Sequence, residues 1–291
     1  YGTVKKKSKF SSYIFILPAL VIYLSVIVVP VLYSVFISLF KWNGVTEKVF
    51  VGLGNYINLF TNDPTFIMAL KNNLIWIVLT IFVTMSVALM FAVLLNKQFR
   101  GRTFFRAYFY LPCVIAGVAV AIIWRWIYDP RIGFVNQFCS ALGIDYKQTW
   151  LSDPKVSLIF VFIASLWQAI GQPMILFLAG LQSVSEDVLE AATIDGTGPV
   201  KKFFYITVPL MKDTFVIVIA TLTTSALKVF DIIKALTNGG PSNSTEMLAT
   251  YMYSQTFQYN NVGMGTAVAV VMVLMMAVVI VPYVSFTAKE Q

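Results

Sequence analysis

Two hydrophobic stretches in the second half of the chain carry polar side chains at helical spacing. In residues 213 to 236, polar residues recur every three or four positions and therefore share one helical face: Thr221, Thr224, Lys228 and Asp231. In residues 156 to 181, a second polar face has an indole beside it: Ser165, Gln168, Gln172 and Trp167. Hydroxyls and amides can hydrogen-bond to the hydroxyls of a neutral sugar, and an indole can stack on its apolar face. We predict that these residues line a binding site for such a solute.

Each of these polar groups has a second interpretation. Amides and hydroxyls also join helices to one another inside a membrane, so packing remains equally open for the face in residues 156 to 181. Lys228 and Asp231 can form a structural ion pair, with the lysine stem reaching toward the membrane surface. Trp167 can anchor its helix in lipid instead of stacking on a solute. For a third polar face, packing is the better explanation: Asn73, Trp76, Thr80 and Thr84.

Composition identifies the class of protein. The chain is 58% hydrophobic and only 12% charged, with a mean hydropathy of +0.79. A soluble domain is about a quarter charged, so the composition indicates an integral membrane protein. The net charge of +8 is spread over short segments between apolar runs, which favours membrane topology over nucleic-acid binding.

Several kinds of chemistry are excluded. There is no histidine, so a Ser/His/Asp triad is impossible and no His/Cys cluster suggests a metal site. No Gly-rich loop ends in Gly-Lys-Ser/Thr, so the chain does not hydrolyse ATP on its own. We expect neither a catalytic site nor a cofactor in this chain.

Hydropathy predicts an all-α fold with several membrane spans. Six stretches are long and apolar enough to cross about 30 Å of hydrocarbon: 13 to 40, 72 to 96, 104 to 128, 156 to 181, 213 to 236 and 263 to 286. We expect them to form one transmembrane domain over residues 1 to 291, with a helix break at Gly171 to Pro173. Lys and Arg are concentrated before the odd-numbered spans and after the last span, which places both termini in the cytoplasm.

Residues 182 to 212 form the main polar interruption in the second half of the chain. Ser185 can cap a short helix, and Gly196 is suited to end it. Pro199 can then begin a second short helix that carries Lys201 and Lys202. The pattern predicts a helix-turn-helix elbow on the cytoplasmic side, although an ordinary amphipathic connector would look similar.

At this elbow the sequence resembles the EAA loop of permease subunits of ATP-binding-cassette importers. The matching residues are Glu190, Ala191, Ala192, Gly196, Ile206, Val208 and Pro209, with Val208 where leucine is more usual. The resemblance implies a type I importer permease fold in which the elbow is a coupling helix seated in the ATPase subunit. It assigns the ATPase contact to Glu190, Ala191, Ala192, Asp195, Gly196, Ile206 and Pro209.

Other segments extend the resemblance to the carbohydrate-uptake, maltose-type branch. They are Gly52 to Tyr56, Leu111-Pro112, Phe230-Asp231 and Thr237 to Pro241. The resemblance implies a multi-pass subunit of the cytoplasmic (inner) membrane that imports a sugar or oligosaccharide by alternating access. Its implied partners are a second permease subunit, two ATPase subunits that bind ATP and Mg, an external solute-binding protein and membrane lipid.

Alternatives remain open at this level. Close relatives in the same branch handle glycerol phosphoesters, and Lys228 would suit such an anion. A secondary sugar transporter is a second alternative, although those folds usually show internal repeats and this chain shows none. A membrane scaffold is a third, but it would need no polar face in residues 213 to 236.

Overall fold

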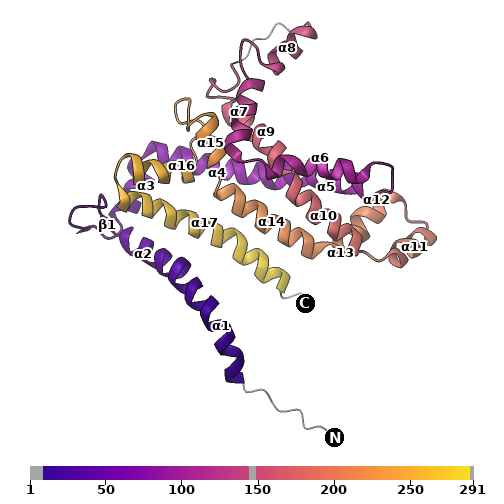
Figure 1. The fold of residues 1–291 in the computed structure, drawn as a ribbon, viewed down its shortest axis with the longest axis horizontal. Helices are drawn as coiled ribbons and strands as arrows, with labels where there is room; N and C mark the ends of the chain where they lie inside the picture. The colour runs from indigo at the N-terminus through magenta and orange to yellow at the C-terminus, as the bar shows by residue number, and fades with distance from the viewer. Residues whose placement is uncertain (1–8, 144–148, 289–291) are drawn as a thin grey trace. The chain divides into compact units, whose positions relative to one another are not determined.

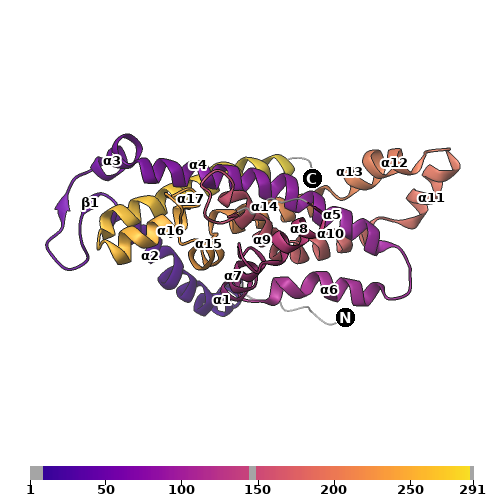
Figure 2. The same ribbon diagram turned by 90° about the horizontal axis from the view of Figure 1, so that it is seen from above.

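The computed structural model describes residues 9–143 and 149–288, and its long elements are all helices (Figures 1 and 2). The predicted all-α class is therefore confirmed. The chain divides into two compact units, residues 1–62 with 252–271 and residues 63–251 with 272–291. A single domain stays a prediction, and so does the placement of the two chain ends, which lie outside the described residues.

The first unit begins with two helices, a hairpin and a short helix: α1 (Lys9–Tyr23), α2 (Val29–Ile37), β1 (Phe40–Lys41), β2 (Val49–Phe50) and α3 (Gly54–Asn62). The strands are antiparallel, with Phe40 opposite Phe50. Asn55 of α3 is buried and donates to the carbonyls of Ser38 at 2.8 Å and Phe40 at 2.9 Å. This side chain therefore holds α3 against the start of the hairpin.

The second unit holds the remaining core helices. Those before the elbow are α4 (Pro64–Leu79), α5 (Met85–Asn96), α6 (Arg102–Val114), α7 (Gly117–Ile127), α8 (Phe134–Ala141), α9 (Ser157–Ala169) and α10 (Gly171–Ser183). The elbow and the helices after it are α11 (Glu186–Ile194), α12 (Pro199–Lys202), α13 (Val208–Leu210), α14 (Lys212–Leu227) and α15 (Asp231–Leu236). The chain then continues through α16 (Leu248–Tyr253) and α17 (Val262–Ala288), which are divided between the units because residues 252–271 belong to the first.

Four π-helical turns interrupt these helices: η1 (Leu24–Val28), η2 (Thr80–Thr84), η3 (Phe203–Thr207) and η4 (Ser254–Gln258). Two of them end two residues before a proline, Pro30 after η1 and Pro209 after η3. Proline has no N–H and its ring crowds the carbonyl four residues back, so a wider turn lets the helix pass it.

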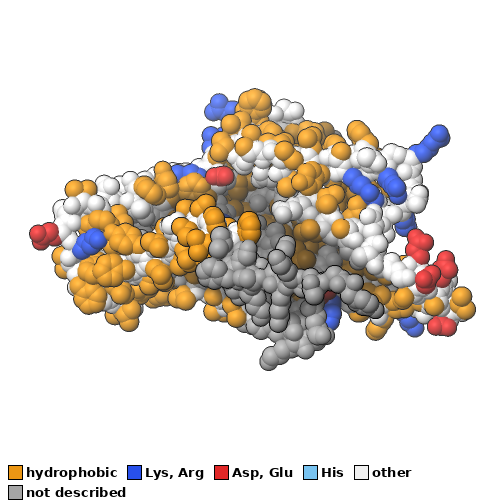
Figure 3. Space-filling view, turned by 60° about the horizontal axis from the view of Figure 1, so that its bottom comes forward, with side chains coloured by type: hydrophobic (Ala, Val, Ile, Leu, Met, Phe, Trp, Pro, Cys, Tyr) orange, Lys and Arg blue, Asp and Glu red, His pale blue; other side chains and the backbone are white. Residues whose placement is uncertain are grey.

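The helices that could span a membrane lie in the predicted stretches, but not all of these stretches are single helices. Four helices of the described chain are long and apolar enough to cross a membrane, and six spans result if each of two bent pairs is one span. These pairs are α6 with α7, bent by 101°, and α9 with α10, bent by 47°. Apolar side chains are spread over much of the surface in Figure 3.

The third predicted span, 104 to 128, is not a single straight helix. Ile115 and Ala116 are extended, so α7 leaves the line of α6 almost at a right angle (Figure 1). Gly117 starts α7 in close contact with α15, because a Cβ there would lie 3.0 Å from the Cβ of Asp231. At the other end, Arg125 donates to the Ala235 carbonyl at 2.6 Å, near the end of α15.

The break predicted at Gly171 to Pro173 is confirmed, since α9 ends at Ala169 and α10 begins at Gly171. A Cβ on Gly171 would lie 3.0 Å from the Cα of Tyr110, so the missing side chain lets α6 approach closely. The fifth span breaks where no break was predicted, between Leu227 and Asp231.

Asn73 of α4 stabilises this second break. Its side chain is fully buried. Its amide nitrogen donates to the Ala226 carbonyl at 3.2 Å, and its amide oxygen accepts from the Leu248 N–H at 2.7 Å. One side chain therefore joins the end of α14 to the start of α16.

Replacing Asn73 with leucine should destabilise the protein. Asn73→Leu leaves a buried carbonyl and a buried N–H unpaired, at about 1–3 kcal/mol each. We expect the melting temperature of the purified protein in detergent to fall by several degrees, while the same change at exposed Asn62 leaves it unchanged. Equal melting temperatures for the two variants would contradict this role of Asn73.

Candidate functional site

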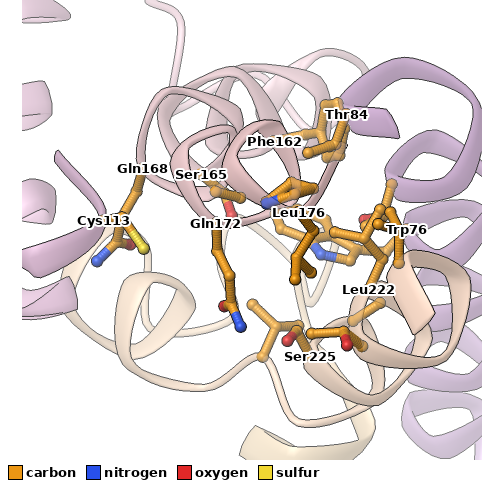
Figure 4. Close-up of a pocket in the computed structure, with 17 residues that line it drawn as sticks. Trp76, Thr84, Cys113, Phe162, Ser165, Gln168, Gln172, Leu176, Leu222 and Ser225 are labelled. Atoms are coloured by element: carbon orange, nitrogen blue, oxygen red, sulfur yellow. The ribbon is translucent and has the colours of Figure 1, made fainter. Parts of the chain in front are cut away.

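A cavity of about 230 Å³ lies among α4, α9, α10 and α14 of the second unit (Figure 4). Its wall contains polar residues of the two predicted faces together with residues of the second span. The polar and aromatic lining residues are Trp76, Thr80, Thr84, Phe162, Ser165, Gln168, Gln172, Thr221 and Ser225. Apolar residues and Cys113 complete the wall.

The cavity brings together half of the predicted site. Ser165, Gln168 and Gln172 from the fourth span meet Thr221 from the fifth. Two of these side chains already form hydrogen bonds within the protein. Gln168 donates to the Ile115 carbonyl at 2.7 Å, and Thr221 donates to the Ile217 carbonyl at 2.7 Å. The other predicted residues do not line the cavity: Trp167, Thr224, Lys228 and Asp231.

Three polar side chains in the wall are free to bind a solute. Ser165, Gln172 and Ser225 make no side-chain hydrogen bond to any described residue. The Gln172 amide offers two donors and one acceptor, and each serine hydroxyl can donate or accept. This set is suited to recognising neutral hydroxyl groups.

The second span contributes more residues to the cavity wall than the sequence indicated. Packing was the preferred explanation for Trp76, Thr80 and Thr84, yet all three line the cavity. Thr80 and Thr84 bound the π-helical turn η2, a type of turn that is frequent at functional sites. The Trp76 ring packs edge-on against Phe162, with centroids 5.2 Å apart. The four-residue spacing of Trp76, Thr80 and Thr84 already predicted that they share one helical face. Only the fold shows that this face lines the cavity.

The described wall of the cavity contains no Asp, Glu, Lys or Arg. Lys228 is exposed at the end of α14, and Asp231 begins α15 against Gly117. The proposed ion pair between them is wrong, because no ion pair joins these two described residues. Their spacing of three suits a continuous helix, and the helix is interrupted between them.

Trp167 faces a different part of the unit. Its ring packs against Trp124 with centroids 6.2 Å apart, and it lines a groove beside α6. Stacking on a solute in the cavity is therefore not supported by its position. Anchoring in the lipid region agrees better with this placement.

The elbow has the local structure that the sequence predicted. Gly196 follows α11 with a left-handed φ of 74°. The Gly196 N–H donates to the Thr193 carbonyl at 3.1 Å, and the Thr197 N–H donates to the Ala192 carbonyl at 3.0 Å, a Schellman motif that closes the helix. Ser185 occupies the N-cap position but its side chain makes no capping bond.

Pro199 begins α12 as predicted, and Lys202 of α12 donates to the Thr193 hydroxyl at 2.9 Å. Most of the predicted coupling residues are exposed or half-buried, and Ala192 is buried. The elbow extends beyond the ends of α10 and α14, to which it is joined (Figure 2). Its exposed face is therefore available to another protein, and contact with an ATPase stays a prediction.

Comparison with known proteins gives the family. The model of the binding-protein-dependent transport system inner membrane component matches residues 85–288. The chain is 36% identical to the probable ABC transporter permease protein YurN of Bacillus subtilis, over 98% of this chain and 99% of that protein. It is 31% identical to the multiple sugar-binding transport system permease protein MsmF of Streptococcus mutans, over 99% of each.

A solved structure has the same fold. It is a bacterial ABC transporter involved in the import of the acidic polysaccharide alginate, with a TM-score of 0.82 and 21% identity over 96% of each chain. The family match and the two relatives agree on a membrane component of a transport system, with ATP hydrolysis on a separate subunit. This chain belongs to the family of binding-protein-dependent transport system inner membrane components.

Proposed function

We propose that this chain is the permease subunit of an ATP-driven importer of neutral sugars or oligosaccharides. The cavity carries the proposal: it offers free hydroxyl and amide groups beside aromatic rings, and its described residues include no Asp, Glu, Lys or Arg. Such a wall can exchange hydrogen bonds with a sugar without burying an unpaired charge. The name of the relative MsmF supports the same substrate class.

The alternative solute, a glycerol phosphoester, fits the cavity less well. A phosphate group needs Arg, Lys or a cluster of N–H donors, and Lys228 does not line the cavity. The second alternative, a secondary transporter, is disfavoured by membership of a family of binding-protein-dependent systems.

Membership of the family supports a larger assembly. We infer a second permease subunit, two ATPase subunits that hold ATP and Mg, and an external solute-binding protein, with both termini of this chain in the cytoplasm. The described residues contain no group of acids and cysteines that could hold a metal. We place nucleotide and Mg on the ATPase subunits because this is what membership of the family implies.

Transport can be coupled to ATP through two helices. α10 runs from the cavity residue Gln172 to the start of the elbow, and α14 runs from the end of the elbow to the cavity residue Ser225. Gly180 lets the two helices pack closely, since a Cβ there would collide with the Thr214 side chain. If the ATPase displaces the elbow, α10 and α14 would thus move together, because they are packed against each other. Their movement would change the wall of the cavity.

The glycines of the elbow allow a matched test of coupling. Gly196→Ala forces a left-handed alanine, at a cost of about 1–2 kcal/mol, whereas Gly198 has a φ of −66° that alanine accepts. Neither added Cβ meets another atom within 4 Å. In the assembled transporter, we expect Gly196→Ala to reduce solute-stimulated ATP hydrolysis several-fold and Gly198→Ala to leave it unchanged. Equal rates in the two variants would remove the elbow from the coupling path.

Single cysteines test where the solute passes. In a background lacking Cys113, which lines the cavity, and Cys139, cysteines at Ser165, Gln172 and Ser225 should react with a small water-soluble thiol reagent. The transported sugar should slow these reactions, because it occupies the same space. The control positions Ile163 and Ile175 lie on the outer surface of the same helix pair and should stay unreactive. Reaction at the controls but not in the cavity would contradict the proposed path.

A further inference from the structure

A second hollow lies beside α6, outside the solute cavity. It has a volume of about 290 Å³, and its wall is apolar and aromatic, including Phe91, Tyr108, Phe109, Leu111, Trp167 and Ile170. It lies where α7 turns away from α6 by 101°, because Pro112 and Ile115 at this bend also line it. This hollow is called the α6 groove below.

A guanidinium group lies one helical turn from the α6 groove. Phe91 of α5 packs against Phe109 of α6, with ring centroids 4.2 Å apart. One turn further along both helices, about 5 Å away, Arg106 donates to the Leu95 carbonyl at 2.9 Å. The Arg106 Nε is buried and has no hydrogen-bond partner. A guanidinium offers five N–H donors, so Arg106 retains donors for a ligand.

Three further cations precede Arg106, and no acid in this part of the chain compensates them. Lys97 and Arg100 are exposed, and Arg102 is half-buried at the start of α6. The sequence contains no Asp or Glu from residue 64 to residue 128. Within the described chain no carboxylate pairs with any of these cations. The α6 groove therefore has an apolar body, and the uncompensated cations lie beyond its Phe91–Phe109 end, which is called its positive end below.

We propose that the α6 groove and its cations bind an anionic phospholipid. The phosphate lies at Arg102 and Arg106, where guanidinium groups can hold it with paired hydrogen bonds. One acyl chain follows α6 past Phe109 and Leu111 into the groove and contacts Trp167. A helix of a protein partner would fill the apolar body equally well, but it would leave the cations unpaired. The positive end is the feature that favours a lipid, and it favours an acidic lipid over a neutral one.

Trp167 provides a direct measurement. The assembled transporter is placed in phosphatidylcholine vesicles that contain a minor fraction of a lipid with brominated acyl chains, which quench nearby indoles. The brominated lipid is either phosphatidylglycerol or phosphatidylcholine. The fluorescence of Trp167 is obtained by subtracting the tryptophan fluorescence of Trp167→Phe from that of the native protein. We expect brominated phosphatidylglycerol to quench Trp167 at a several-fold lower fraction of the vesicle lipid than brominated phosphatidylcholine. The double variant Arg102→Gln with Arg106→Gln should lose this preference, and the control Arg131→Gln with Lys155→Gln, at exposed positions outside the groove and the elbow, should keep it.

Each other result overturns the proposal. Equal quenching by the two lipids means that only ordinary surrounding lipid reaches the α6 groove. Absence of quenching by either lipid means that a protein partner covers it. Solute-stimulated ATP hydrolysis by the variants shows that they are assembled, so a lost preference cannot be attributed to misfolding.

Discussion

Backbone hydrogen bonding inside the membrane is the constraint on which the rest of this structure depends. In hydrocarbon, each unpaired backbone N–H or carbonyl costs several kcal/mol, so a span can break only where other groups take over its bonds. At the break of the third span, the Ile115 carbonyl accepts from Gln168. At the break of the fifth, the Ala226 carbonyl accepts from Asn73. Each bond comes from a neighbouring helix, so the breaks also hold the helices together.

The same breaks build the candidate site. Gln168 and Ala226 both belong to the wall of the cavity, which places the irregular backbone beside the space where a solute would sit. Because Gln168 and Asn73 bond to the carbonyls of Ile115 and Ala226, the side chains of Ser165, Gln172 and Ser225 are not needed there and keep unused donors and acceptors. Transporter sites are commonly found where spans are discontinuous, and this arrangement gives that association a physical basis here.

Hydropathy and cap residues predicted much of the fold. The apolar stretches, the break at Gly171 and the Gly196 turn follow from local chemistry that the sequence displays directly. The break between Leu227 and Asp231 contains neither glycine nor proline, and it depends on tertiary partners that no local pattern encodes. The pairing of Lys228 with Asp231 assumed a continuous helix and therefore failed with it.

Candidate site residues were predictable to the extent that they share a helical face. Spacing placed Ser165, Gln168 and Gln172 together, and likewise Trp76, Thr80 and Thr84, but it could not show which face meets a cavity and which meets another helix. The cavity uses both faces and leaves out Trp167, whose adjacent position in the sequence corresponds to a different side of α9.

The most direct measurement is a structure of the assembled transporter with its solute trapped in the membrane. We predict density for a neutral sugar within hydrogen-bond distance of Gln172 and Ser165, with an aromatic ring of Trp76 or Phe162 against it. A solute resolved beside Lys228, or held entirely by the second permease with this cavity empty, would contradict the central claim.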